Sequence, residues 1–428
     1  MASIVSQQPK TAEWQSLDQG RTVIRPISGG VTAPRGFQAA GVSCGIKKRR
    51  PNADAPLDLA LLTADLAVPA AAVFTVNKAV AAPVVVSREH MASSHGLIKA
   101  IVANAGCANA ATGTAGMQVA REMAAATAAA VGCSADQVLV ASTGVIGVLL
   151  DIDKVRLGVT KAKTALSDKG SDAATQAIMT TDPFPKSYAV EAETPDGLIT
   201  VGGMAKGSGM IEPRMATMLG FLTTDAKVEP AVLAGALRRV VDRTFNAITV
   251  DGECSTNDCV FLLASGESGI EITRDDDSRL VEPLMAVAGY LAREIVRGGE
   301  GATKLVTVQV KGAATENDAW LAARTIANSP LVKTAINGGD PNWGRLIAAS
   351  GRSGAAFVLD HVSVSIGDVD VFVDGTPHDE RAEAAAKVLE DATLTITVDL
   401  GTGGTHHATM WTCDFSAEYV RINAEYRT

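Results

Sequence analysis

The chain has 428 residues, of which 47% are apolar and 20% are charged. This composition excludes disorder as the dominant state and allows one large domain or two tightly joined ones. A net charge of −9, an aromatic content of 4% and the lack of a long basic run argue against a nucleic-acid partner.

The first half of the chain predicts alternating strands and helices behind a polar start. Residues 1–24 lack a sustained period, so we predict a poorly ordered lead-in there, without a secretory signal. The elements predicted after it are, in order, strands at 81–87 and 99–106, a helix at 113–132 ending at Gly132, a strand at 137–147, a helix at 154–167, and strands at 187–194 and 197–209.

After the short piece MATML at 215–219 the pattern becomes more helical. The elements predicted here are helices at 229–245 and 277–299 with strands at 246–252 and 259–266 between them, then strands at 304–313, 362–375 and 393–401, helices at 319–329 and 379–391, and a strand-like end from Ala417. This mixture predicts a layered α/β protein with partly antiparallel pairing. We place a main domain over 25–303, a smaller α/β domain over 304–415 and a terminal strand over 416–428.

Cysteine usage and hydropathy predict a cytoplasmic location. The six cysteines include no CxxC pair and none has zinc-ligand spacing with histidine, so we expect a reducing compartment and no metal site. The longest apolar windows are interrupted, as by Asp65 and Pro69, and are too short to cross a membrane.

Common nucleotide and histidine motifs are missing. In GMAKGSG at 203–209 the lysine precedes the glycine, whereas a phosphate loop needs Gly-Lys-Ser/Thr at its end. Adjacent His406 and His407 would face opposite sides of a strand, and no Ser-His-Asp arrangement stands out. Acyl chemistry in this chain would therefore need a base other than histidine.

A threonine can use its own α-amino group as that base. The α-amino pKa of about 7.7 to 8.0 leaves a useful unprotonated fraction near neutral pH. An internal threonine reaches this state only if the peptide bond before it is cut, and small Ala216 leaves room for the hydroxyl of Thr217 to attack. Taken alone, a threonine in this position is more often a residue at the start of a helix than a nucleophile, and local chemistry favours that interpretation of Thr217.

The segment KGSGMIEPRMATMLGFLTTDA at 206–226 resembles the signature of the ornithine acetyltransferase family, also called bifunctional glutamate N-acetyltransferase. Further blocks resemble the family in its order, from about residue 28 to the end: GGVTAPRGF, VFTVNKAVAAPVVVSREH, ASTGVIG, AIMTTDPFPK, ITVDGECSTND, GGEGATK, NSPLVKTAINGGDPNWGR and INAEYRT.

The resemblance implies a role for each matching residue. Thr217 matches the nucleophile, released by self-cleavage between Ala216 and Thr217 into an α chain of 1–216 and a β chain of 217–428. Thr143 and Gly144 match the oxyanion-hole pair. Substrate contacts are implied for Thr180, Lys206, Thr217, Glu300, Asn423 and Thr428, with Thr181 an alternative to Thr180. The chain departs from the family pattern at Cys107, Glu212 and Arg214.

The resemblance also implies a fold and a reaction. The fold would be a layered α-β-β-α sandwich with a second, smaller α/β domain. The reaction would move acetyl from N2-acetylornithine to glutamate by a ping-pong route, without a metal or organic cofactor, and with acetyl-CoA as an additional donor in bifunctional members. The two chains would assemble as a heterotetramer of two α and two β chains.

Two rival functions remain at this stage. A related self-cleaving amidase or aminopeptidase would pass the acyl group to water, and consumption of acetylornithine without glutamate would favour it. An uncleaved, non-catalytic scaffold is the other, and the presence of Thr143, Gly144, Lys206 and Thr217 counts against it.

Overall fold

One long strand, β3 (Leu59–Phe74), connects the two sheets of the larger part of the molecule. The structure is a computed structural model that describes residues 22–48, 54–212 and 218–425. The first half of β3 pairs with β2 (Phe37–Val42) and β4 (Leu97–Cys107), and its last residues pair with β10 (Cys259–Ala264). Its register with β4 shifts between Thr63 and Val68, and such irregularities bend a strand and allow it to change partner.

Side-chain alternation along these strands produces four layers. Ala100 and Val102 of β4 pack with three helices, whereas Ile101 and Ala103 face the other sheet. The remaining strands of this part are β1 (Val23–Ile27), β5 (Val138–Val145), β6 (Lys186–Thr194), β7 (Gly197–Lys206) and β8 (Leu219–Thr224). The order helix–sheet–sheet–helix is the α-β-β-α sandwich expected from the resemblance.

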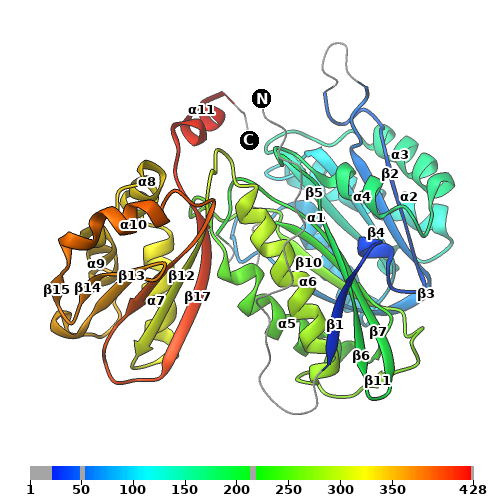
Figure 1. Ribbon diagram of the computed structural model, residues 1–428. Coiled ribbons are helices and arrows are strands. Elements are labelled where there is room, and N and C mark those ends of the chain that lie inside the picture. Colours follow the sequence, from blue (N-terminus) through cyan, green and yellow to red (C-terminus); the bar gives the residue numbers. More distant parts are fainter. Residues whose placement is uncertain (1–21, 49–53, 213–217, 426–428) are drawn as a thin grey trace.

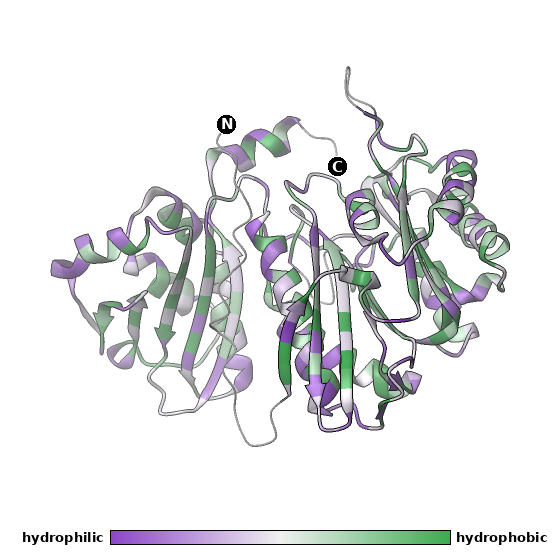
Figure 2. Cartoon of the chain, turned by 45° about the vertical axis from the view of Figure 1, so that its right-hand side comes forward, coloured by the Kyte–Doolittle hydropathy of each residue, from purple (hydrophilic) through white to green (hydrophobic). Residues whose placement is uncertain are grey.

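Amphipathic helices cover both outer faces (Figure 1). One side carries α1 (Ala82–Ser93), α2 (Gly113–Val131) and α3 (Ile152–Ala165); the other carries α5 (Pro230–Arg243) and α6 (Ser278–Arg297); and α4 (Ser171–Ile178) packs between the sheets at their edge. Figure 2 shows polar and apolar residues alternating along the helices, the pattern of elements with one face buried. No helix within the described ranges is both long enough and apolar enough to span a bilayer.

A six-stranded sheet forms a second, smaller α/β unit beside the sandwich (Figure 1). Its strand order is β15-β14-β13-β16-β12-β17. The elements are β12 (Leu305–Ala313), β13 (Ser363–Ile366), β14 (Val369–Val373), β15 (Thr376–Pro377), β16 (Thr393–Asp399), β17 (His406–Cys413), α7 (Glu316–Ala327), α8 (Pro330–Gly338), α9 (Trp343–Gly351) and α10 (Ala382–Val388). Trp411 of β17 packs into the core of the sandwich, so the two units share apolar surface.

Several predicted elements are confirmed. The helix predicted at 113–132 is α2, and Gly132 closes it in the left-handed conformation at φ 71°. The strands predicted at 99–106 and 137–147 are β4 and β5, and the helices predicted at 229–245 and 277–299 are α5 and α6.

Three predicted strands are wrong. The valine-rich run at 81–87 lies in α1, where Pro83 in the first turn favours helix and the valines face the core. The segment 246–252 contributes only the end of a short 3-10 helix (Phe245–Ala247) and an isolated bridge from Ile248 to Trp411. The terminal strand over 416–428 is instead α11 (Ala417–Glu425) within its described residues.

Local charge pairing explains the helical end of the chain. Arg421 pairs with Glu418 three residues before it and with Glu425 four residues after it, spacings at which side chains meet only on a helix. The alternation of polar and apolar residues in this segment therefore does not indicate a strand. Most of the predicted lead-in lies outside the described residues, and β1 already begins at Val23.

Candidate functional site

A cavity of about 160 Å³ lies where β5, β7, β8 and β10 end or begin. The residues assigned from the sequence that line it are Thr143, Gly144, Thr180, Lys206, Glu300 and Asn423, together with the alternative Thr181. Met218 and Leu219 line it as well, so the cavity adjoins the start of the expected β chain. Ala216, Thr217, Arg214 and Thr428 lie outside the described residues.

The turn at Thr143 and Gly144 depends on two backbones approaching closely. Gly144 has φ 128°, in the region that favours glycine, and it pairs with Gly106 of β4. A Cβ at position 144 would lie 2.4 Å from the carbonyl carbon of Gly106 and 2.6 Å from the nitrogen of Cys107. Only glycine fits here without displacing the neighbouring strand, so the turn has a fixed backbone geometry.

Two buried asparagines brace this turn from behind. Asn257 donates from Nδ2 to the carbonyls of Ala108 at 2.6 Å and Ser142 at 3.0 Å. The Ser142 hydroxyl in turn donates to Oδ1 of Asn104 at 2.6 Å. Ser142, immediately before Thr143, is thus held by hydrogen bonds to the loop before β10 and to strand β4. Sequence reasoning missed Asn104 and Asn257, although Asn257 stands in the polar STND that directly precedes a buried strand.

Lys206 is the last residue of β7 and enters the cavity from the opposite sheet. Only 9% of the residue is exposed, and Nζ donates to Oγ1 of Thr143 at 3.1 Å. Burial lowers the pKa of Lys206, while the carboxylate of Asp182 opposes that change. A buried cation next to a hydroxyl and a backbone turn is suited to binding an anionic group.

Asp182 holds the backbone that follows Lys206 and pairs with a second buried lysine. Its carboxylate lies 2.7 Å from Nζ of Lys186, and both side chains are fully buried. The same carboxylate accepts the N–H groups of Gly207 at 2.8 Å and Thr180 at 3.0 Å. Burial alone would raise the pKa of Asp182, but Lys186 and Lys206 outweigh it and hold the pKa well below its usual range.

Glu300 reaches the cavity beside a glycine. A Cβ on Gly209 would lie 2.4 Å from Oε2 of Glu300, so a side chain at position 209 would occupy the space of this carboxylate. The N–H of Glu300 donates to the carbonyl of Ser208 at 2.8 Å. The Ser208 hydroxyl lies 2.6 Å from that of Thr181, whereas Thr180 contributes its N–H to Asp182. Both threonines line the cavity, so Thr180 and Thr181 both remain candidates for contact with the substrate.

The C-terminal helix completes one wall. Asn423 of α11 donates from Nδ2 to Oε2 of Glu300 at 2.9 Å, and the hydroxyl of Tyr419 donates to Oδ2 of Asp251 at 3.1 Å. Burial, and then the charge of Asp251, raises the pKa of Tyr419, so the hydroxyl stays protonated and able to donate. The end of the chain returns to the cavity, as the resemblance implied, but as a helix. In the described part of the chain, no three or more His, Cys, Asp or Glu side chains are grouped to hold a metal ion.

A model of the ArgJ family matches residues 38–428. The chain belongs to the ArgJ family. The arginine biosynthesis bifunctional protein ArgJ of Symbiobacterium thermophilum is 48% identical over 405 residues, covering 94% of this chain and 99% of that protein. The protein of the same name from Chlorobaculum tepidum is 47% identical over 408 residues, covering 95% and 99%. The ornithine acetyltransferase of Mycobacterium tuberculosis, solved with ornithine, is 41% identical and covers 45% of this chain and 100% of that one, with a TM-score of 0.40.

The positions that depart from the ArgJ family pattern have separate surroundings. Glu212 pairs with Arg324 of α7 at 2.9 Å, so this residue connects the approach to the cavity with the smaller unit. The Cys107 thiol donates to the carbonyl of Val148 at 3.2 Å, and burial raises its pKa. A buried, protonated thiol is a poor nucleophile, so Cys107 is a packing residue. Arg214 lies outside the described residues.

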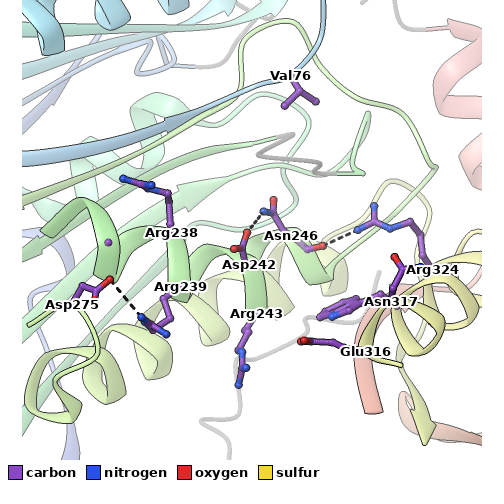
Figure 3. A pocket seen from close by; sticks show the side chains of 12 residues that line it. Val76, Arg238, Arg239, Asp242, Arg243, Asn246, Asp275, Glu316, Asn317 and Arg324 are labelled. Atoms are coloured by element: carbon purple, nitrogen blue, oxygen red, sulfur yellow. Dashed lines mark hydrogen bonds and ion pairs between the residues drawn. The ribbon is translucent and has the colours of Figure 1, made fainter. Parts of the chain in front are cut away.

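A second and larger cavity, of about 1000 Å³, lies between α5 and α7 (Figure 3). Arginines line it together with carboxylates, and Figure 3 shows Arg239 directed at Asp275 and Asn246 directed at Asp242. None of the residues assigned from the sequence lines this cavity. Its larger volume therefore does not make it the reaction site.

The buried pair of Lys186 and Asp182 gives a prediction about stability. Lys186→Met would leave Asp182 buried without its nearest cation, and breaking a buried pair in this way costs about 3–5 kcal/mol. In the wild type the lowered pKa of Asp182 adds stability above the unfolded-state pKa, and that contribution is lost as pH falls. The deficit of the variant should thus be large near pH 7 and smaller near about pH 3, below the unfolded-state aspartate pKa of about 3.9.

Urea unfolding of wild type and variant at both pH values measures this difference. Lys163→Met, at an exposed lysine of α3, is the matched control and should cost little at either pH. If the deficit of Lys186→Met in the free energy of unfolding is the same at both pH values, the charge pair of Lys186 and Asp182 does not stabilise the folded chain.

Proposed function

We propose that this chain transfers the acetyl group of N2-acetylornithine to L-glutamate, giving ornithine and N-acetylglutamate in cyclic arginine biosynthesis. The observation that carries the proposal is the meeting of Thr143, Gly144 and Lys206 in one cavity at the head of β8, where the expected β chain begins. Membership of the ArgJ family, whose relatives include bifunctional proteins of arginine biosynthesis, supports the same reaction.

In this proposal Thr217 is made a nucleophile by cleavage of its own peptide bond to Ala216. The freed α-amino group takes the hydroxyl proton while Oγ attacks the acetyl carbonyl. The Gly144 N–H and the Thr143 hydroxyl donate to the resulting oxyanion. Collapse of this intermediate transfers the proton to the leaving amine, so ornithine departs and an acetyl ester of Thr217 remains. The glutamate amine then attacks the ester and regenerates the hydroxyl.

Both substrates share an α-amino-acid end, and the proposal assigns their common carboxylate to Lys206. Its buried ammonium is held 3.1 Å from the Thr143 hydroxyl, close to the proposed oxyanion position. The second carboxylate of the site, Glu300, oriented by Asn423, is assigned to the side-chain ammonium of ornithine. Thr180 or Thr181, Thr217 and Thr428 are the remaining proposed contacts.

The proposal also covers the assembly of the cleaved chains, the acetyl donors and the location of the enzyme. The α and β chains of the cleavage would stay together and assemble as a heterotetramer of two α and two β chains. No metal or organic cofactor takes part, and acetyl-CoA serves as a second acetyl donor to glutamate. We also propose that the enzyme works in the cytoplasm.

Transfer of labelled acetyl tests the reaction. Acetylornithine labelled in the acetyl group should give labelled N-acetylglutamate when glutamate is present, with parallel lines in double-reciprocal plots, because donor and acceptor use one site in turn. If acetate forms at the same rate without glutamate, the enzyme is a hydrolase of acetylornithine and not a transferase. No turnover of acetylornithine by correctly cleaved protein would contradict the proposal altogether.

Lys206→Met should raise KM for both acetylornithine and glutamate by roughly 10- to 100-fold, since a hydrogen bond to a charged group is worth about 1.5–3 kcal/mol. Steady-state kinetics with each substrate varied in turn measure this, on protein whose cleavage has been verified. Lys311→Met, on β12 outside the cavity, is the control and should leave both KM values near wild type. An effect confined to one substrate would contradict a shared carboxylate site.

A further inference from the structure

Asp414 is a buried carboxylate that the proposed reaction does not use. It directly follows β17, is 1% exposed and is not among the described residues that line the cavity. Its Oδ1 accepts the N–H groups of Thr303 at 2.8 Å and Lys304 at 2.9 Å. Its Oδ2 accepts the Thr303 hydroxyl at 2.5 Å and Nδ2 of Asn337 at 2.7 Å. A carboxylate has about four acceptor positions, so Asp414 uses its full capacity to join the loop before β12 to the chain after β17.

The loop and the chain after Asp414 approach each other closely. The Ser416 hydroxyl donates to the carbonyl of Gly301 at 2.6 Å. Gly301 has φ 69°, and a Cβ there would lie 2.4 Å from the backbone nitrogen of Tyr419, so no side chain fits between the two segments. Glu300 directly precedes this contact. The position of its carboxylate therefore depends on how the loop lies against the chain after Asp414.

The helix that carries Asn423 depends on the same anchor. α11 buries none of its residues, so packing in a core does not hold it, and it begins three residues after Asp414 (Figure 1). Its remaining ties are polar. Tyr419 donates to Asp251 at 3.1 Å, and Asn423 donates to Oε2 of Glu300 at 2.9 Å. A shift at the start of α11 would therefore move the Asn423 amide away from the carboxylate that it orients.

The charge of Glu300 acts in opposite directions on the two proposed substrates. The side chain of ornithine ends in an ammonium group, whereas that of glutamate ends in a carboxylate, and the two occupy one site in turn. A carboxylate fixed in the cavity attracts the first side chain and repels the second. Any residue that holds Glu300 in place therefore affects the affinities for the two substrates differently.

We propose that Asp414 is a positioning residue for the pair of Glu300 and Asn423, and that it thereby sets the preference of the site for the cationic side chain. This inference rests on the proposed function, because that function assigns the ornithine ammonium to Glu300. Asp414 does not touch the substrate. It holds the loop at Thr303 and the chain that leads into α11, and so keeps the Glu300 carboxylate beside the Asn423 amide.

Asp414→Asn tests this role. Asparagine keeps the size of the side chain but replaces one acceptor oxygen by an amide group that only donates, so two hydrogen bonds are lost. We expect KM for acetylornithine to rise about tenfold, the factor that corresponds to a weakened interaction with a charged group. KM for glutamate should stay the same or fall, and kcat should change little. The Kd of ornithine, measured by titration calorimetry, should rise by the same factor as KM for acetylornithine.

Glu300→Gln shows whether Asp414 acts through Glu300. If it does, adding Asp414→Asn to Glu300→Gln should change KM for acetylornithine by less than about twofold, because changes that act through one group are not additive. Ser416→Ala removes only the hydrogen bond to Gly301, and should raise the same KM by a smaller factor. Asp391→Asn, at an exposed aspartate before β16, is the matched control and should leave both KM values unchanged. Chain masses measured first confirm that each protein compared is cleaved.

Three results would overturn the inference. They are an equal rise in KM for both substrates, additive effects of Asp414→Asn and Glu300→Gln, and a wild-type KM for acetylornithine in Asp414→Asn. Ser416→Ala decides the matter if Asp414→Asn does not fold, since it must also raise KM for acetylornithine and not KM for glutamate. Failure of the proposed function is distinct, since an uncleaved wild type, or one without transfer, would show it before any variant is made.

Discussion

The buried carboxylate of Asp182 is the interaction on which the geometry of the cavity depends. It neutralises Lys186, accepts two backbone N–H groups and fixes the turn that follows Lys206. Without this carboxylate, the backbone at the end of β7 would lose the hydrogen bond at Gly207 that fixes it next to Lys206. The stabilisation by Asp182 is electrostatic and is strong because the surroundings have a low dielectric constant. For the same reason, removing one partner leaves a buried charge that lowers the free energy of unfolding.

The layered sheets determine which groups this carboxylate can bring together. β3 joins the two sheets, so the end of β5 and the end of β7 come from different layers yet meet at one edge of the sandwich. Gly144 permits the backbone of one layer to approach its neighbour, and Lys206 crosses from the other. The smaller unit contributes through α11, which leaves β17 and returns to Glu300. Folding thus creates one cavity from segments that lie between Ala108 and Asn423 in the chain.

Sequence patterns were sufficient for elements whose periodicity reflects burial, such as α2 with its terminal glycine, α5, β4 and β5. They failed at the run 81–87, because fully buried valines look alike in a strand and in a helix packed against a sheet. At the C-terminus they failed because α11 buries no residue and has no strong apolar face to read.

The candidate site divides in the same way. Residues within distinctive family motifs, such as Thr143, Gly144, Lys206 and Glu300, could be named from the sequence and are brought together in the cavity. Asp182, Asn104 and Asn257 could not. The partners of the two asparagines lie in distant segments of the chain, and nothing in the sequence shows that the nearby pair of Asp182 and Lys186 is buried. A buried polar residue acquires its meaning only from the neighbours that the fold supplies.

The proposed reaction requires Thr217 to become a nucleophile by cutting the chain before itself. Mass spectrometry of the purified, denatured protein tests it directly, with Thr217→Ala as the control. We expect two chains of nearly equal length in place of the intact 44.0 kDa protein, the second beginning at Thr217, and a single chain for the variant. A wild-type protein that remains one intact chain would contradict it, because no amino base would then exist in the cavity.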